Sequence, residues 1–382
     1  MRKIYRRGIA AVLGACLLFA ALAGCSSKAS QEGLGNGWEP IDSMELQFAN
    51  QFAVDYYEGG YKLITLADGS RFLTIPEGSE VPRGIAKDIV PLQQPLENIY
   101  LAPSAAMCLF DALDCMDAIS MTSTDQDGWY IENAKLAMQD GRIQYVGKYN
   151  EPDYELLLEN SCPLAIESLM IEHATEVRDK LNELDIPVFV DHSSLESHPL
   201  GRTEWMRLYG ALFNAEDQAD ALFQEQVDYL NEALDSEDTG KTAAFFYISS
   251  SGSVVARKTG DYITKMIELA GGHYVFDELG DPETATSTAT IEMEAFFAAA
   301  KDADYIFYNS TIGGELETMD DLLEKSELLA EFKAVQNGNV WCTAQNMYQE
   351  TTRLGQMVQS FHMIFTGEAD ELDELPYLYR LH

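Results

Sequence analysis

The sequence predicts an α/β protein of two lobes, each with a mainly parallel central sheet flanked by helices, joined by a single long linking helix. Short apolar segments alternate with helical patterns over residues 97–200, and the same alternation returns over residues 242–382. Strand–helix–strand repeats with short connections are typical of right-handed crossovers in parallel sheets. A long helical pattern with no strand beside it separates the two regions.

The first residues predict export from the cytoplasm. Four basic residues precede an apolar run, Ile9 to Leu22, that is too short to span a membrane as a mature helix. The run ends in Leu-Ala-Gly-Cys, which resembles a bacterial lipobox, where the Cys is acylated and becomes the new N-terminus. We therefore expect a signal peptide at 1–24, a lipid anchor at Cys25 and a flexible tether at 25–43. An ordinary signal peptide with a chance Cys is the alternative.

The charge excludes one class of function. The chain carries a net charge of -38, and loss of residues 1–24 moves it to about -42. Such a surface repels the phosphates of nucleic acids, so nucleic-acid binding is excluded. A mature chain of this length exceeds one comfortable core, and two domains are the default expectation.

The cysteines and histidines give no sign of a metal site or a cofactor. No C-x-x-C spacing occurs, and no His pair has the i,i+4 or H-x-H spacing of a preformed site. We expect no cofactor, no protein-held metal and no disulfide. The cysteines beyond the signal peptide are interpreted as buried apolar residues: Cys108, Cys115, Cys162 and Cys342.

The first lobe, predicted over residues 44–200, begins with a β meander. Phe48 to Ile75 shows strand patterns punctuated by Gly59-Gly60 and Asp68-Gly69, whereas Pro76 to Pro95 is irregular. The α/β part follows. Its expected strands are Asn98 to Ala102, Asp117 to Met121, Pro163 to Ile166 and Pro187 to Val190, and its expected helices end near Leu113, Met138 and Leu184.

Two consecutive helices are predicted in the linking region, 201–241. Arg202 to Phe213 forms the first, and Asn214 can adopt the left-handed conformation that ends it. The second, Ala215 to Asp235, has one apolar face and a length of roughly 30 Å, about the width of a domain. We expect this helix to pack across both lobes; an ordinary surface helix of one lobe is the alternative.

The second lobe, 242–382, repeats the pattern of the first. Its expected strands are Ala243 to Ile248, Tyr305 to Tyr308 and Val340 to Thr343, and its expected helices are Asp261 to Ala270 and a last segment from Gln345 to Phe365.

Four segments carry a family resemblance: VGKYNEPDYELLLENSCPLAIES (146–168), LGRTEWMRLYGALFNAEDQADALFQEQ (200–226), GDYITKMIELAGGHYVF (260–276) and IEMEAFFAAAKDADYIFY (291–308). In order and spacing they resemble the substrate-binding lipoproteins of bacterial ABC importers, in the class that handles iron-siderophores, haem and cobalamin. The meander at 44–92 has no counterpart in this pattern.

The resemblance implies a docking role for two glutamates. In this family each lobe presents a glutamate to arginines of the permease, and the matching positions are Glu155 and Glu294. An acid in the first turn of a helix is stabilised in its ionised form by the helix dipole. Helix capping alone also explains acids in a first helical turn. Glu151 and Glu292 are the neighbouring alternatives for the docking role.

Ligands of open parallel sheets bind beyond the carboxyl ends of the strands, so the cleft between the lobes is the expected site. Aromatic rings suit macrocyclic or flat ligands, and cations suit carboxylate, catecholate or phosphate groups. The residues predicted to contact the ligand are Trp129, Tyr130, Arg257, Lys258, Tyr308, Met347 and Tyr348.

We interpret the chain as a lipid-anchored receptor that acts as a monomer, and not as an enzyme, because G-x-S-x-G, Walker and G-x-G-x-x-G frames are missing.

 
Its cargo is expected to be a ferric-siderophore-type chelate, with cobalamin or haem as the alternative, delivered to a permease that works with separate ATPase subunits. For haem, His173, His198, Met170 or Tyr130 is a candidate axial ligand. A membrane-anchored hydrolase and a two-lobe sensor are the remaining alternatives.

Overall fold

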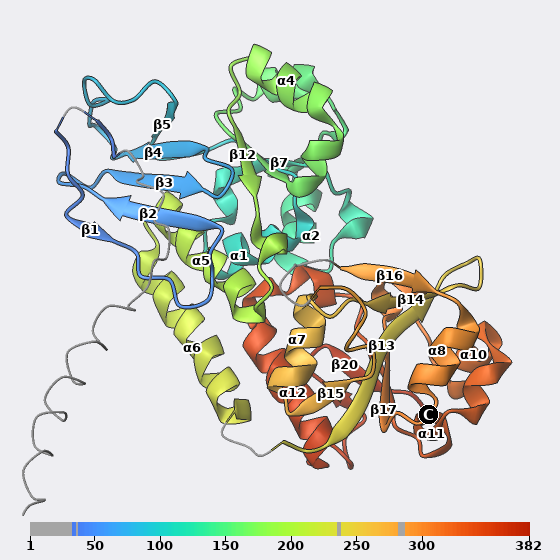
Figure 1. The fold of residues 1–382 in the computed structure, drawn as a ribbon. Coiled ribbons are helices and arrows are strands. Elements are labelled where there is room, and N and C mark those ends of the chain that lie inside the picture. The colour runs from blue at the N-terminus through green and yellow to red at the C-terminus, as the bar shows by residue number, and fades with distance from the viewer. Residues whose placement is uncertain (1–32, 36, 235–237, 282–286) are drawn as a thin grey trace, which may run out of the picture.

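The computed structural model describes residues 33–35, 37–234, 238–281 and 287–382. The predicted signal peptide, Cys25 and residues 26–32 and 36 of the tether lie outside these residues. The described chain forms a β-sheet at the N-terminal end and two α/β lobes, with helices α5 and α6 between them (Figure 1). We call these parts the N-terminal sheet, the first lobe and the second lobe. Where one domain ends and the next begins stays a prediction.

The N-terminal sheet confirms the predicted meander and extends it. Its strands are β1 (Asp42–Ser43), β2 (Phe52–Tyr56), β3 (Lys62–Leu66), β4 (Arg71–Ile75) and β5 (Ile89–Gln93), in that order. β1 to β4 pair antiparallel, and β5 pairs parallel to β4. The prediction that Pro76 to Pro95 is irregular was therefore wrong for β5. Pro91 is tolerated there because β5 is an edge strand.

The first lobe has an all-parallel sheet of five strands in the order β12-β11-β6-β7-β8. Helices α1 and α2 pack on one face and α3 and α4 on the other. The strands are β6 (Ile99–Leu101), β7 (Ile119–Thr122), β8 (Gln144–Tyr145), β11 (Ala165–Ser168) and β12 (Val188–Asp191), and β9 (Gly147–Lys148) and β10 (Glu151–Pro152) form a separate ribbon. The helices are α1 (Met107–Ala112), α2 (Glu132–Gln139), α3 (Tyr154–Glu159) and α4 (Thr175–Glu183).

The second lobe has a mixed sheet. β13 (Lys241–Ile248), β17 (Tyr305–Tyr308) and β18 (Val340–Thr343) are parallel neighbours at its centre, as predicted. The strands at both edges of the sheet pair antiparallel. On one side these are β14 (Val254–Arg257) and β16 (Thr288–Ile291), and on the other β20 (Leu378–Arg380) and β19 (Glu374–Leu375). A further strand, β15 (Gly272–Tyr274), pairs parallel with β13. The helices are α7 (Tyr262–Leu269), α8 (Met293–Ala300), α9 (Ser310–Gly313), α10 (Met319–Lys325), α11 (Lys333–Gln336) and α12 (Leu354–Thr366).

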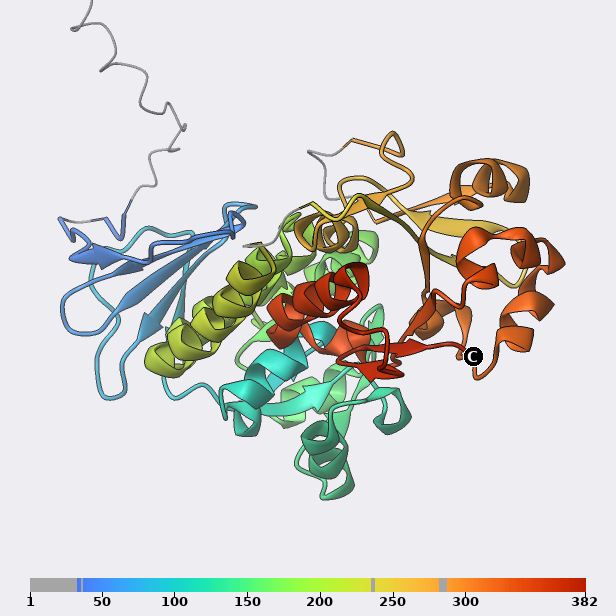
Figure 2. The same cartoon turned by 90° about the horizontal axis from the view of Figure 1, so that it is seen from below.

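Helices α5 (Pro199–Phe213) and α6 (Glu216–Leu234) form the predicted pair, and Asn214 between them is left-handed with φ 59° and ψ 39°. Ala219 near the start of α6 lies in the first-lobe core, whereas Phe223 and Leu230 lie in the second-lobe core. α6 therefore packs across both lobes, beside α5 and α12 (Figure 2). None of the helices in the described ranges is long and apolar enough to cross a membrane.

Two buried carboxylates attach the N-terminal sheet to α5. Glu204, on α5, accepts backbone N–H groups of Gln47, Phe48 and Ala49, each at 2.8 Å. Glu196, just before α5, accepts those of Asn50 and Gln51 at about 3.0 Å, and burial raises its pKa. Buried charges are tolerated only when hydrogen bonds replace water, and these donors supply them.

A lysine of the N-terminal sheet fixes the joint between α5 and α6. The Nζ of Lys62, on β3, is buried and donates to the carbonyl of Ala211 at 2.9 Å and to Oδ1 of Asn214 at 2.8 Å. It also forms an ion pair with Glu216, the first residue of α6. The carbonyls of the last helical turn have no partner within the helix, so Lys62 completes α5 and holds α6 to it.

Replacing Glu204 with Gln should destabilise the protein by about 3 kcal/mol. The backbone N–H groups that Glu204 accepts now bond to two carboxylate oxygens, whereas the amide of Gln offers them one acceptor oxygen. Differential scanning calorimetry measures the loss as a lower transition temperature. The matched control is Glu45→Gln, since the Glu45 side chain is exposed. Equal transition temperatures for both variants would show that the carboxylate does not hold the segment.

Candidate ligand site between the lobes

The segment between β18 and α12 connects the lobes. A 3₁₀ turn, η7 (Met347–Gln349), runs beside the first lobe. The Gln349 side chain accepts the backbone N–H of Tyr130 at 2.8 Å and donates to the carbonyl of Gly128 at 2.7 Å. The hydroxyl of Tyr130 donates to Oε1 of Gln345 at 3.3 Å. The amide of Gln349 therefore bonds both a backbone N–H and a backbone carbonyl of the first lobe, and these two bonds fix the distance between the lobes at this point.

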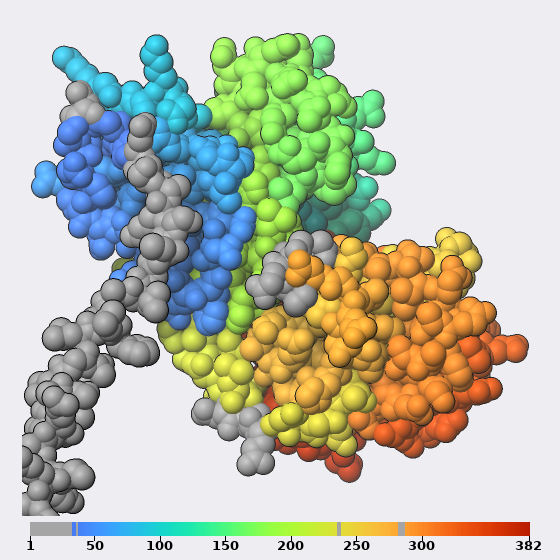
Figure 3. Space-filling view, in the orientation of Figure 1, coloured from blue at the N-terminus to red at the C-terminus, as the bar shows by residue number. Residues whose placement is uncertain are grey.

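Three further contacts close the junction. The guanidinium of Arg202, on α5, lies 3.8 Å from the ring centre of Tyr262, on α7. The hydroxyl of Thr203 donates to the carbonyl of Thr351 at 2.8 Å, and the hydroxyl of Thr351 donates to the carbonyl of Ala105 at 3.3 Å. The lobes therefore meet through polar contacts on several elements, and Figure 3 shows the notch between the green first lobe and the orange second lobe.

A cavity of about 570 Å³ lies at this junction. Its walls come from α1 and α2 of the first lobe, from α5 and α6, and from the start of α12 in the second lobe, so both lobes and the linking helices contribute. The size lies within the range of small-molecule sites. The lining residues are Cys108, Asp111, Ala112, Tyr130, Ile131, Glu132, Met206, Leu222, Glu225, Gln226, Tyr229, Glu350, Thr352, Arg353 and Gln356.

Carboxylates dominate the polar lining of the cavity. Asp111 accepts from Nδ2 of Asn133 at 2.8 Å, and Glu350 accepts from Nδ2 of Asn346 at 3.1 Å. Burial raises the pKa of Glu350, and Arg353 opposes this rise. Nothing in the sequence singles out these acids, because the chain contains 63 Asp and Glu residues and the acids of the cavity lie far apart along it.

Three of the predicted ligand residues are not at the surface, which corrects the prediction. Trp129 is 1 % exposed and packs in the first-lobe core. Tyr308 and Met347 are buried in the second-lobe core. The hydroxyl of Tyr308 donates to the carbonyl of Gly313, and burial raises its pKa to about 12. Neighbouring residues at strand ends and turns point in different directions, so a loop position does not imply an exposed ring.

Arg257 is also withdrawn from the surface. Its side chain, 7 % exposed, pairs with Asp261 at 3.3 Å and contacts the hydroxyl of Tyr348. Burial acts to lower the pKa of Arg257, but Tyr348 and Asp261 outweigh it and raise that pKa above the ordinary value. Tyr348 is partly buried and accepts from Nδ2 of Asn309 at 2.9 Å. Lys258 is partly exposed, and within the described ranges its ammonium forms no hydrogen bond or ion pair. Among the predicted residues, Tyr130 alone lines the cavity.

Comparison with known proteins agrees with this architecture. The family model described as periplasmic binding protein matches residues 119–346. The chain belongs to this family. An uncharacterized lipoprotein of Methanocaldococcus jannaschii is 26% identical over 301 residues, which cover 76% of this chain and 70% of the relative.

Two solved structures show the same fold as this periplasmic binding protein. The petrobactin-binding protein YclQ from Bacillus subtilis has a TM-score of 0.57 and 13% identity, covering 80% of this chain and 98% of its own. A periplasmic heme binding protein from Pseudomonas aeruginosa has a TM-score of 0.56 and 16% identity, covering 75% of this chain and 99% of its own.

Both predicted docking glutamates of the binding protein are exposed in first helical turns. Glu155 follows the α3 N-cap Asp153, whose carboxylate accepts the backbone N–H of Glu155 at 3.0 Å. Glu294 is the acid in the first turn of α8. The placement expected for the docking role is present, and the role itself stays a prediction.

The alternative haem ligands differ in accessibility. His198 stacks on Phe48 at 4.3 Å and accepts the backbone N–H of Leu200, and burial lowers its pKa to about 4. It is therefore engaged at the start of α5, whereas His173 and Met170 are exposed.

Cys108, Cys162 and Cys342 are buried thiols as predicted, Cys115 is half-buried, and all four are free. The described residues contain no group of three or more His, Cys, Asp or Glu arranged to hold a metal ion.

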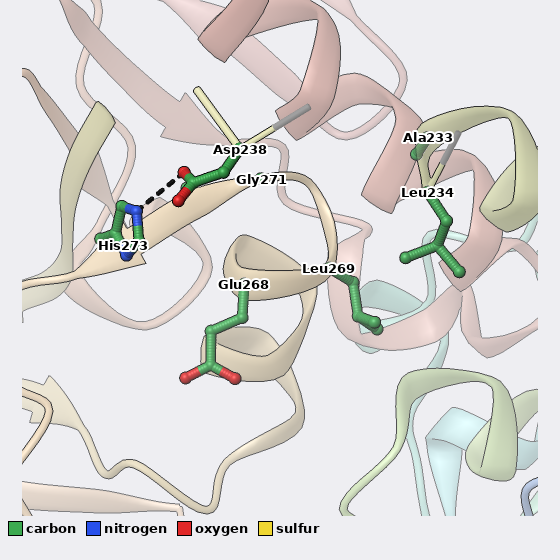
Figure 4. A pocket seen from close by; sticks show the side chains of 8 residues that line it. Ala233, Leu234, Asp238, Glu268, Leu269, Gly271 and His273 are labelled. Atoms are coloured by element: carbon green, nitrogen blue, oxygen red, sulfur yellow. Dashed lines mark hydrogen bonds and ion pairs between the residues drawn. The ribbon is translucent and has the colours of Figure 1, made fainter. Parts of the chain in front are cut away.

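A second cavity, of about 430 Å³, lies at the end of α6 (Figure 4). Its walls come from α6, α7 and β15, so the first lobe contributes nothing to it. Asp238 and His273 form an ion pair at 2.8 Å beside it. The junction cavity is the better candidate, because both lobes line it.

Glu167, near the carboxyl end of β11, is a buried acid that sequence reasoning missed. It is 0 % exposed, and neither carboxyl oxygen has a hydrogen-bond partner among the described residues. It lies on the α3 and α4 face of the sheet, where the charged and titratable groups nearby are Arg178, Tyr100 and Tyr154. Burial raises its pKa to about 8, and Arg178 opposes this rise.

Glu167 should make stability depend on pH. Its pKa is higher in the folded state than its ordinary value of 4.5, so the folded state holds the proton more tightly. The stabilisation is present below pH 4.5 and is lost as the pH rises through about 8. Glu167→Gln, which stays neutral, should become more stable than the natural protein by a few kcal/mol between pH 5 and pH 9, at about 1.4 kcal/mol per pKa unit.

Urea unfolding at both pH values measures this difference. Glu176→Gln, an exposed acid of α4, is the matched control and should leave the pH dependence unchanged. Parallel pH profiles for the natural protein and Glu167→Gln would contradict a raised pKa.

Proposed function

We propose that the protein is the extracytoplasmic substrate-binding lipoprotein of an ABC import system, anchored through Cys25, with a ferric-siderophore-type chelate as its cargo. The observation that carries the proposal is the junction cavity, because binding there contacts both lobes at once. A solute held in this way links cargo occupancy to the arrangement of the lobes. The protein itself catalyses no reaction in this role.

The comparisons support the proposal. A relative carries the name lipoprotein, in line with a lipid anchor and a place on the extracytoplasmic face of the cell membrane. The solved structures with the same fold are named for petrobactin and heme binding, and cobalamin or haem remains the alternative cargo.

We further propose that Glu155 and Glu294 dock the protein, as a monomer, on the permease. Each is exposed, and each stands at a helix N-terminus, where the dipole favours the ionised carboxylate. Charged groups so placed are suited to pairing with arginines of a partner. The permease would then receive the cargo, with separate ATPases supplying the energy.

Calorimetric titration of the mature chain in mild detergent tests the cargo class. Ferric siderophores, haem and cobalamin form the panel, with iron-free siderophores and ferric citrate as controls. We expect one metal complex to saturate the protein with a Kd below about 1 µM. Tightest binding by haem or cobalamin would replace the chelate with that alternative, and silence across the panel would rule out all three.

Replacing both Glu155 and Glu294 with Ala should abolish uptake of the cargo by cells while its Kd for the purified protein stays unchanged. The physical reason is that both side chains face solvent and neither lines the junction cavity. Glu159→Ala with Glu324→Ala, exposed acids of α3 and α10, is the control with the same loss of charge. Normal uptake by the docking variant, or a weaker Kd, would remove the docking role.

A further inference from the structure

The junction cavity has a marked imbalance of charge. Its lining contains four carboxylates, on Asp111, Glu132, Glu225 and Glu350, against the single guanidinium of Arg353. The acids come from α1, α2, α6 and the segment before α12, so they approach the cavity from different sides. An arrangement of one sign on several walls focuses the potential inside a concave site.

Two of these acids have no hydrogen bond or close ion pair of their own. Glu132 and Glu225 are exposed, and in the described part of the chain neither side chain forms a hydrogen bond or an ion pair at contact distance.

 
Arg353 is the lining residue able to offset them, and Tyr377, Glu350 and Glu225 all raise its pKa against the effect of burial, so one cation is shared among several acids. The cavity therefore keeps an excess of negative charge.

The cations that the sequence suggested for ligand binding do not change this balance. Arg257 is buried against Asp261 and Tyr348, and neither Arg257 nor Lys258 lines the cavity. The rest of the molecule adds to the same field, because the whole chain carries a net charge of -38. An approaching anion is repelled at long range by the surface and at short range by the lining.

The ring faces in the cavity act in the same direction. Tyr130, on the first lobe, and Tyr229, on α6, both line it. The face of an aromatic ring carries the negative part of its quadrupole and attracts cations rather than anions.

We infer that the cargo is a ferric complex without net negative charge, of the neutral or cationic hydroxamate type rather than the anionic catecholate type. This inference rests on the proposed function and names the chemical class of its cargo. Hydroxamate groups lose one proton each on binding ferric iron, so three of them balance its charge. Catecholates lose two protons each, and their complex is triply anionic.

Competitive calorimetry on the mature chain tests the inference with three complexes that differ in charge: ferrioxamine B, which is cationic, ferrichrome, which is neutral, and ferric enterobactin, which is anionic. We expect ferrioxamine B or ferrichrome to bind at least about tenfold more tightly than ferric enterobactin. Raising the salt concentration from about 0.05 M to 0.5 M should weaken ferrioxamine B more than ferrichrome, because salt screens exposed charges.

A pair of variants locates the effect. Glu132→Gln with Glu225→Gln removes the two acids of the cavity that form no hydrogen bond and should weaken ferrioxamine B several-fold while leaving ferrichrome nearly unchanged. Asp217→Asn with Glu159→Gln removes the same charge from exposed positions outside the cavity and should change neither Kd.

The outcomes separate the two proposals. Tightest binding by ferric enterobactin would overturn the charge class and leave the siderophore receptor standing. Equal effects of the two variant pairs would overturn the assignment to this cavity. No binding of any ferric complex would overturn the proposed function, and the charge class with it.

Discussion

The attachment of residues 47–51 to two buried carboxylates is the constraint on which the arrangement of the molecule depends. Glu204 and Glu196 each take several backbone N–H groups in place of water. Both lie on or beside α5, so the N-terminal sheet is joined to the same helix that leads into the lobe junction. Lys62 extends this attachment to Asn214 and to the first residue of α6. The N-terminal sheet therefore holds the helix pair against which both lobes pack.

The fold was predictable where local chemistry decides it. Asn214 has a side chain that tolerates the left-handed conformation, and its position between two apolar periodicities predicted the joint of α5 and α6. The central strands of both lobes were predictable because they are buried and continuously apolar. β14, β16 and β20 were not, because marginal antiparallel strands are short and depend on a partner strand distant in sequence.

The candidate site was less predictable than the fold. Tyr130 was predicted and lines the cavity, but Trp129 beside it is a core residue. The difference between adjacent residues lies in side-chain direction, which follows from the 3₁₀ turn before them and not from residue type. The acids of the cavity come from positions spread between 111 and 350, and nothing in a single acidic sequence distinguishes them from solvated ones.

The Gln349 amide gives the lobe junction a particular thermodynamic character. Separating the lobes there breaks two hydrogen bonds within the protein, and the four groups that made them bond to water instead. The net free energy of such an exchange is about 1 kcal/mol per internal bond. The groups uncovered are a backbone N–H, a carbonyl and an amide, and polar exposure does not raise the heat capacity as apolar exposure does. Opening at this contact therefore adds no large positive heat-capacity change, so its enthalpy varies little with temperature. Since Gln349 bonds only to main-chain atoms of residues 128 and 130, the contact does not depend on which side chains stand at those positions.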